Sequence, residues 1–125
     1  MLIDTHVLMD LLGKGTRIGP TTHDLLSADM VFVSVASTWE MAIKAAKGKL
    51  TMPPNLGSAI TDAGVRPLPI RLEHSLAIGE IDGVRHGDAF DRLLLTQAKV
   101  EGLDFCTWDR AILAADLPFV KDARA

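Results

Sequence analysis

The stretch MVFVSVASTWEMAIKAAKG, residues 30–48, decides the fold. Residues 30–33 are β-branched and aromatic, which predicts a strand. Ser34 can cap a helix that continues to Lys47 and ends at Gly48. Apolar side chains recur along this helix at helical spacing and predict its core face: Val35, Trp39, Ala42, Ile43 and Ala46. A strand that leads directly into an amphipathic helix indicates an α/β fold.

The same alternation extends in both directions along the chain. Further strands are predicted at residues 1–4, 66–70, 103–107 and 118–120. Further helices are predicted at residues 7–12, 21–28, 56–63, 72–81, 89–101 and 111–115. Pro67 and Pro69 suggest that their strand lies at an edge of the sheet. We therefore expect one α/β domain over residues 1–125, with a mainly parallel sheet and helices on both faces.

Composition narrows the class of protein. The net charge of −3 counts mildly against a nucleic-acid-binding protein, because such proteins are usually basic. It counts less if several acids are metal ligands, since bound cations would reverse the local field. The single cysteine, Cys106, excludes an internal disulfide and fits a reducing compartment. With no apolar run near the ~18 residues of a membrane span and no basic N-terminal signal segment, we expect a cytoplasmic protein that binds no membrane.

Acidic residues follow several of the predicted strands. In open α/β sheets, sites form beyond the carboxyl ends of the strands. Four acids from distant segments can converge there: Asp4 at the end of the first strand, Glu40 two turns into the helix of residues 34–47, Asp91 in the first turn of the helix of residues 89–101, and Asp109 just past the strand of residues 103–107. The sequence thus predicts a carboxylate cluster at one edge of the sheet.

Each acid also has a structural alternative. Asp4 and Asp109 can cap the helices that follow them. Glu40 can pair with Lys44 in the favourable i,i+4 order, which is worth only about 0.3–0.5 kcal/mol. Spacing alone leaves capping and ion pairing open beside a shared site.

A cluster of unpaired carboxylates repels itself and is stable when it holds a divalent cation. Ligation by oxygen alone suits Mg²⁺ or Mn²⁺ better than zinc. Asp88 and Asp91 have the spacing of an N-cap and the third helical residue, and for Asp88 capping is the preferred interpretation. The histidines lack the paired spacing of zinc ligands, so we expect surface or packing roles for all four: His6, His23, His74 and His86.

Three blocks of the chain resemble the PIN-domain family, and most closely its VapC-type toxins of toxin–antitoxin pairs. The blocks are LIDTHVLMDLL (2–12), VSVASTWEMAIKAAKGKL (33–50) and GDAFDRLLLTQAKVEGLDFCTWD (87–109), in an order and spacing that cover nearly the whole chain. The resemblance implies a three-layer α/β/α sandwich. It also implies an endoribonuclease that depends on one or two Mg²⁺ or Mn²⁺ ions.

The resemblance assigns roles to individual residues. The matched acids are Asp4, Glu40, Asp91 and Asp109, with Asp88 at the edge of the site, where it contacts metal through water. Thr5 and Thr107 resemble hydroxyl residues that orient these acids, and the basic residues considered for substrate phosphates are Lys44, Lys47 and Arg92. For these three, solvated or ion-paired roles are the alternative.

Two positions depart from the family pattern. Ala89 stands where a proline is frequent, which matters little because proline at the first helical position is dispensable. Trp108 precedes Asp109. Its indole either packs against the sheet, which we prefer, or stacks on a substrate base.

The resemblance also implies partners. These are an RNA substrate, a homodimer, and a cognate VapB-type antitoxin whose arginine or lysine would enter the acidic groove. Substrate specificity would depend on loops such as residues 14–22 and 82–87. Two alternatives stay open: a PIN-domain nuclease that acts in RNA maturation or on DNA, and a non-catalytic metal- or protein-binding module in which the acids only cap helices.

Overall fold

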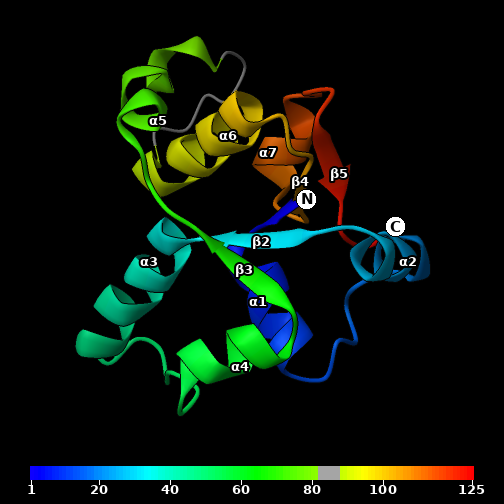
Figure 1. Cartoon of the computed structure of the whole chain (residues 1–125), viewed down its shortest axis with the longest axis vertical. Coiled ribbons are helices and arrows are strands. Elements are labelled where there is room, and N and C mark those ends of the chain that lie inside the picture. The colour runs from blue at the N-terminus through cyan, green and yellow to red at the C-terminus, as the bar shows by residue number, and fades with distance from the viewer. Residues whose placement is uncertain (82–87) are drawn as a thin grey trace.

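Five parallel strands form the central sheet (Figure 1) of the computed structural model, which describes residues 1–81 and 88–125. The strands are β1 Leu2–Ile3, β2 Val31–Ser34, β3 Val65–Leu68, β4 Phe105–Thr107 and β5 Val120–Asp122. Their order is β3-β2-β1-β4-β5, and each neighbouring pair is parallel. The edge position predicted from Pro67 and Pro69 is confirmed for β3, although the strand covers Val65–Leu68 rather than residues 66–70 and Pro69 follows it. The loop of residues 82–87, with His86, lies outside the described residues.

Helices connect the strands as the sequence predicted. They are α1 Thr5–Leu12, α2 Pro20–Ala28, α3 Val35–Ala46, α4 Leu56–Asp62, α5 Leu72–Leu76, α6 Ala89–Glu101 and α7 Arg110–Ala114. The helix predicted at residues 72–81 is divided into α5 and a 3₁₀ turn, Ile78–Glu80. The last strand begins at Val120 rather than at residue 118. In the part of the chain that the structure describes, no helix combines the length and the apolar character needed to cross a membrane.

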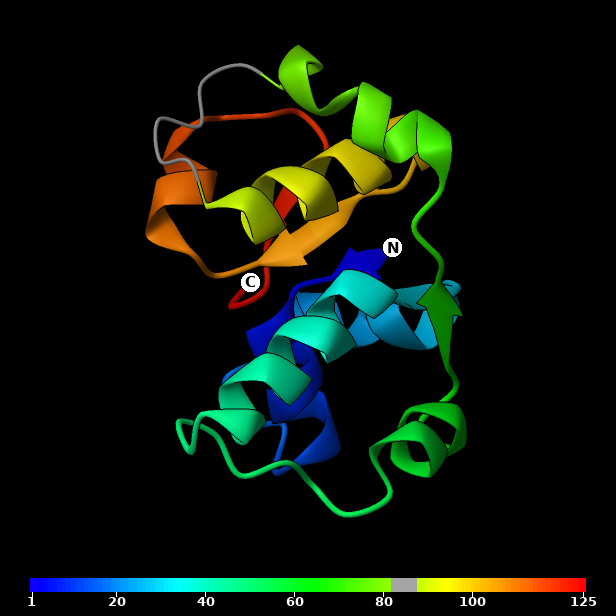
Figure 2. The same ribbon diagram turned by 90° about the vertical axis from the view of Figure 1, so that its left-hand side faces the viewer.

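Two apolar cores lie on opposite faces of the sheet, because successive strand residues point to opposite sides. On one face Ile3 and Cys106 pack with Val7 and Leu8 of α1. On the other face Leu2 and Phe105 pack with α6 and α7 through side chains that include Leu94, Leu95 and Ile112. Figure 2 shows α6 on one side of the strands and α1 and α3 on the other. The arrangement is the three-layer α/β/α sandwich that was predicted.

The predicted core face of α3 was wrong. Its buried residues are Ala36, Ser37 and Met41, whereas the Trp39 side chain is 61% exposed. Of the remaining predicted core residues, Val35, Ala42 and Ala46 are exposed and Ile43 is half-buried. Helical spacing identifies an apolar stripe but does not say whether it meets the sheet or the outside. Here Ala36, Ser37 and Met41 face the sheet, and the predicted stripe lies mainly on the outer side of α3.

Candidate active site

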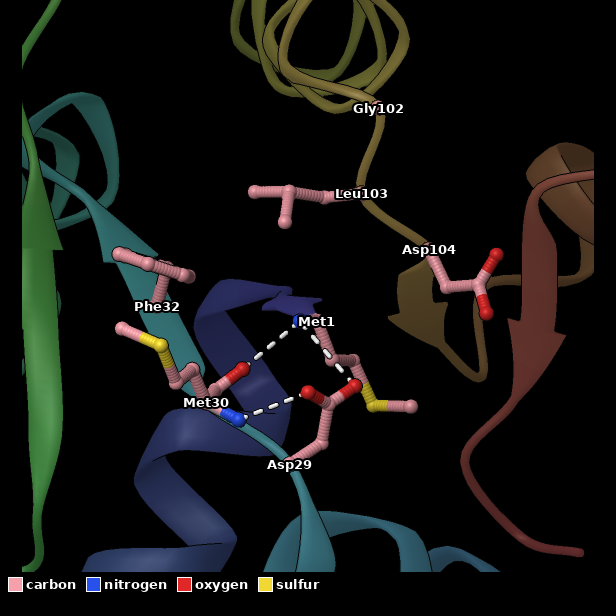
Figure 3. A pocket seen from close by; sticks show the side chains of 7 residues that line it. All are labelled: Met1, Asp29, Met30, Phe32, Gly102, Leu103 and Asp104. Carbon is pink, nitrogen blue, oxygen red and sulfur yellow. Dashed lines mark hydrogen bonds and ion pairs between the residues drawn. The ribbon is translucent and has the colours of Figure 1, made fainter.

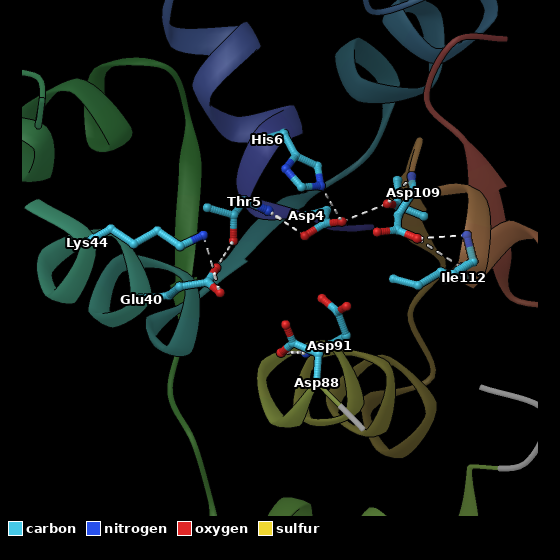
Figure 4. Close-up of polar contacts among 11 residues, drawn as sticks. Asp4, Thr5, His6, Glu40, Lys44, Asp88, Asp91, Asp109 and Ile112 are labelled. Carbon is cyan, nitrogen blue, oxygen red and sulfur yellow. Dashed lines mark hydrogen bonds and ion pairs between the residues drawn. The ribbon is translucent and has the colours of Figure 1, made fainter. Parts of the chain in front are cut away.

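The carboxyl ends of the strands bring the predicted acids together. Asp4 follows β1, Asp109 follows β4, Asp91 lies in the first turn of α6 and Glu40 lies in α3. All four line one pocket of about 200 Å³ (Figure 4). The pocket is also lined by Thr5, His6, Met9, Met41, Lys44, Leu50 and Asp88. The predicted convergence of acids from four distant segments is therefore present in the structure.

Asp4 is buried and held by three donors. Its Oδ1 accepts from the Thr5 backbone N–H at 2.7 Å, and its Oδ2 accepts from the Thr107 hydroxyl at 2.6 Å. His6 Nε2 lies 3.2 Å from the same Oδ2. Burial opposes ionisation of Asp4, but the hydrogen bonds from His6, Thr107 and Thr5, with the charge of His6, outweigh it and lower the pKa below its ordinary value. Asp4 is therefore a fixed negative charge at neutral pH.

The Thr107 hydroxyl joins Asp4 to Asp109. Besides donating to Asp4, its oxygen accepts from the Asp109 backbone N–H at 3.0 Å. Asp109 Oδ1 caps α7 by accepting from the N–H groups of Ala111 and Ile112, at 2.8 and 3.1 Å. Asp109 thus caps a helix, as the structural alternative predicted, and its carboxylate also lines the pocket. Capping takes one oxygen and does not exclude a second role.

Glu40 is oriented from α1 and from its own helix. The Thr5 hydroxyl donates to Glu40 Oε1 at 3.3 Å, and Lys44 Nζ lies 3.8 Å from Oε2. The threonine of α1 therefore contacts Glu40 while Thr107 contacts Asp4. Both predicted hydroxyl residues touch an acid of the pocket.

Asp91 differs from the other acids. Its neighbour Asp88 caps α6 by accepting from the N–H groups of Phe90 and Asp91. Within residues 1–81 and 88–125, no hydrogen bond reaches the Asp91 carboxylate, which points from α6 toward Asp4 and Asp109 (Figure 4). Burial, followed by the charges of Asp88, Asp4, Asp109 and Glu40, raises the pKa of Asp91 from 3.8 to about 7.

His6 has the surface and packing role that the sequence predicted, since its side chain is half-exposed and packs on Trp108, but its contact with the pocket acids was not predicted. Its ring contacts Asp4 and also stacks on Trp108, with centroids 5.8 Å apart. The hydrogen bond to Asp4 outweighs burial and raises the pKa of His6 above 6.5, and the charges of Asp109 and Asp91 add to this. Its position two residues after a strand-end acid is the signal that could have identified it. Trp108 is half-buried and packs against the core, as preferred from the sequence.

The three basic residues considered for substrate phosphates lie in different surroundings. Lys44 lines the pocket and pairs with Glu40. Lys47 is exposed at the C-cap of α3 and does not line the pocket. Arg92 Nη1 is directed to the Ile78 carbonyl oxygen at 3.5 Å and also lies outside the pocket lining. Only Lys44 is brought to the acids.

The donor set fits a hard divalent cation by chemistry and charge. The converging ligand atoms are carboxylate oxygens, which Mg²⁺ and Mn²⁺ prefer. Besides its burial, the charges of neighbouring acids raise the pKa of Asp91, and a bound cation would relieve this repulsion. Among the described residues, however, no three acidic, histidine or cysteine side chains already stand close enough to form a ligand group. The pocket therefore supplies suitable ligand types without a preformed coordination shell.

A second pocket, of about 310 Å³, lies at the amino ends of the strands (Figure 3). Its lining consists of Met1, Asp29, Met30, Phe32, Gly102, Leu103 and Asp104. Its polar contacts are structural, since the Met1 amino group donates to the Met30 carbonyl at 2.8 Å and lies 3.9 Å from Asp29. Of the described acids only Asp29 and Asp104 line it, and Asp29 is paired with the Met1 amino group, so this pocket does not rival the one at the carboxyl ends.

Comparison with known proteins bears on the fold and the family. In fold, the chain is similar to one in a toxin–antitoxin complex from Klebsiella pneumoniae, with a TM-score of 0.66, 16% identity, and coverage of 98% of this chain and 96% of the other. It is similarly close to a chain of VapBC2 from Rickettsia felis bound to a DNA fragment from their promoter, with a TM-score of 0.68, 14% identity, and coverage of 96% of each chain. No curated protein sequence matches the chain. The family model described as the PIN domain matches residues 1–117, and the chain therefore belongs to the PIN-domain family.

Proposed function

We propose that this protein is a Mg²⁺- or Mn²⁺-dependent endoribonuclease and the toxin of a VapBC-type toxin–antitoxin pair. The observation that carries the proposal is the convergence of Asp4, Glu40, Asp91 and Asp109 in one pocket of a PIN domain. The two similar structures are both toxin–antitoxin complexes, which supports the biological half of the proposal.

The proposed reaction is hydrolysis of an RNA phosphodiester by in-line attack of water. The four acids would hold one or two ions, with Asp88 contributing through water. Such ions lower the pKa of an attacking water and offset charge on the leaving oxygen. We assign orientation of the water to Asp91, because its carboxylate accepts no hydrogen bond from the described residues and points from α6 toward Asp4 and Asp109 (Figure 4). Lys44 stays a proposed contact for phosphate.

The same proposal includes partners and location. An antitoxin segment that inserts an arginine or lysine would meet the negative potential around Asp91. Exposed apolar side chains of α3 and α5, among them Trp39, Leu72 and Leu76, are suited to burial in a homodimer. The single free cysteine, Cys106, fits a cytoplasmic location.

Cleavage assays test the catalytic half. The purified chain should cleave single-stranded RNA with Mn²⁺ or Mg²⁺ and stop in excess EDTA. Asp91→Asn should reduce cleavage by about a thousandfold, a loss typical of removing a group that acts in the transition state. Asp62→Asn, at the exposed end of α4, is the matched control and should retain full activity. Cleavage that persists in EDTA, or in Asp91→Asn, would refute the mechanism.

The non-catalytic module remains the second candidate because a specific observation favours it. Asp4, Asp88 and Asp109 each accept backbone N–H groups at the start of a helix, as that alternative requires. Calorimetric titration with Mn²⁺ separates the two functions. Absence of binding at millimolar metal, together with absence of cleavage, would favour the module. Cleavage of DNA in preference to RNA would instead favour a PIN-domain nuclease outside toxin–antitoxin systems.

A further inference from the structure

A basic and aromatic hollow lies beside the carboxylate pocket. It has a volume of about 370 Å³ and is lined by Arg17, Trp108 and Arg124. The Arg17 guanidinium lies over the Trp108 ring, 5.9 Å from its centroid. Neither arginine was among the basic residues considered for substrate phosphates, whereas Trp108 was considered for stacking on a substrate base. The hollow is therefore a feature that the carboxylate site does not account for.

The loop between α1 and α2 is fixed in a way that holds Arg17 in position. Asp10 Oδ2, in α1, accepts from the backbone N–H groups of Arg17 and Ile18, at 3.1 and 3.3 Å. Gly19 donates its N–H to the Ala123 carbonyl at 2.9 Å. A Cβ at Gly19 would lie 2.2 Å from the Arg124 carbonyl oxygen, so only glycine permits this approach of the C-terminal segment. The close packing brings Arg124 to the same hollow as Arg17.

A continuous row of side chains connects the hollow to the carboxylates. His6 bonds to Asp4 on one side and stacks on Trp108 on the other. The Arg17 guanidinium in turn lies over the Trp108 ring, and Trp108 directly precedes Asp109. The His6 ring thus bridges Asp4 and Trp108, and Trp108 lines the hollow.

The two arginines differ in how far their charge is already neutralised. Arg124 donates to both oxygens of Asp122, each at 3.1 Å. Arg17 forms no ion pair with any carboxylate in the described parts of the chain, and its side chain is exposed. A guanidinium held on an aromatic face and lacking a carboxylate partner is suited to a phosphate. Arg17 is therefore the cation of the hollow that is available to an anion.

We propose that Arg17 binds a backbone phosphate of the RNA strand next to the scissile bond, with Trp108 as the residue that positions the guanidinium. The inference rests on the proposed function, since it names how that substrate is held. An acidic pocket repels a polyanion, so cations at its border are needed to retain the strand on either side of the bond that is cut. Arg17 supplies one such contact at the Trp108 side.

Binding of a short single-stranded RNA to the Asp91→Asn protein tests the proposal without cleavage. Arg17→Ala should weaken binding about tenfold, as loss of a charged hydrogen bond does. It should also reduce the slope of log affinity against log salt concentration by about 0.7, the value for one phosphate contact on a single strand. Arg66→Ala, which removes an exposed arginine of β3, is the matched control and should change neither quantity. In a Trp39→Phe background, RNA should change the fluorescence of Trp108.

Active protein supplies the second readout. Arg17→Ala should raise KM with little change in kcat, whereas Asp91→Asn lowers kcat. Millimolar inorganic phosphate should not displace the RNA, which separates a strand contact from a general anion site. Equal RNA affinity and salt dependence in Arg17→Ala and Arg66→Ala would overturn the inference, as would failure of Asp91→Asn to bind RNA. If the unmodified protein does not cleave RNA at all but RNA binding still depends on Arg17, the catalytic proposal is refuted and the inference about Arg17 is not.

Discussion

The two sides of the carboxylate pocket are built in opposite ways. On the sheet side, Asp4 and Asp109 are held by backbone and hydroxyl donors from β4, α1 and α7. On the α6 side, Asp91 faces the same space and accepts no hydrogen bond from the described residues. The pKa of Asp4 is accordingly lowered and that of Asp91 is raised to about 7.

This difference separates carboxylates that stabilise the fold from carboxylates that destabilise it. A carboxylate that accepts several hydrogen bonds stabilises the fold through its charge. One that is half-buried among other acids destabilises the fold when it loses its proton, until a cation compensates it. The two kinds of acid should therefore respond oppositely to the same substitution.

The largest expected effect on stability is at Asp4. Asp4→Asn keeps a side chain that can cap α1 but removes the charged acceptor of Thr107 and His6. We expect a loss of about 2–3 kcal/mol in the free energy of unfolding, the range for a buried hydrogen bond to a charged group. Urea unfolding near neutral pH measures it. Unchanged stability in Asp4→Asn would show that the sheet side of the pocket is not held by this charge.

The opposite sign is expected at Asp91. In the unfolded chain its pKa is near the ordinary 3.8, and in the folded protein it is about 7. Stability should therefore fall as pH rises from about 4 to about 7, because unfolding then releases a proton. Asp91→Asn should remove this slope and stabilise the protein by about 1–2 kcal/mol near pH 8, after allowance for solvent screening. Denaturant unfolding of both proteins across this pH range is the measurement.

The effect of Mn²⁺ on stability tests whether Asp91 is a metal ligand. Since an ion that binds only the folded protein raises its stability, millimolar Mn²⁺ should stabilise the unmodified chain more than Asp91→Asn. Equal stabilisation of both proteins would mean that Asp91 is not a ligand.

Much of the fold and of the pocket could be predicted from the sequence, and the reasons are local. Asp4 ends one predicted strand and Asp109 lies just past another. Because parallel strands share one carboxyl edge, their convergence follows from topology. Capping by Asp88 follows from its position before α6. The unlike chemistry of Asp4 and Asp91 could not be predicted, because it depends on which donors the fold brings to each carboxylate.

Features that depend on side-chain direction or on contacts between distant segments were missed. The apolar stripe of α3 that contains Trp39 faces outward, and helical spacing cannot tell the two faces apart. The row from His6 through Trp108 to Arg17 joins two loops that are about ninety positions apart in the sequence. The approach of Arg124 to the same hollow depends on Gly19, whose close packing against the C-terminal segment no local pattern indicates.

A smaller effect on stability is expected at the Thr107 hydroxyl, which links Asp4 to Asp109. Thr107→Val keeps the shape of the buried side chain but removes the donor to Asp4 and the acceptor for the Asp109 N–H. We expect a loss of about 1–2 kcal/mol in stability and a higher pKa for Asp4. Thr5→Val removes only the longer contact to Glu40, at 3.3 Å, and should cost less. Equal losses in the two variants would contradict the special position of Thr107.

The smallest and most diagnostic effect is expected at His6, whose side chain is 50% exposed. Because its folded pKa is raised above 6.5, its charge stabilises the protein fully below pH 6.5, and this stabilisation is lost as pH rises through the raised value. His6→Phe keeps an aromatic ring for Trp108 and removes the charge, so it should be less stable than the unmodified protein by under about 1 kcal/mol near pH 5.5 and nearly equal near pH 9.

Asp91 titrates in an overlapping range with the same sign, so the His6 contribution is best measured with Asp91→Asn as the parent protein. The charge of Asp91 is also one of those that raise the pKa of His6. In Asp91→Asn, the difference in stability caused by adding His6→Phe should therefore disappear at a slightly lower pH. The control for replacing an exposed histidine by phenylalanine is His23→Phe, in α2 and outside the lining of the carboxylate pocket. If the loss of stability caused by His6→Phe does not vary with pH, His6 contributes only by packing on Trp108. The sheet side of the pocket would then not depend on the charge of His6.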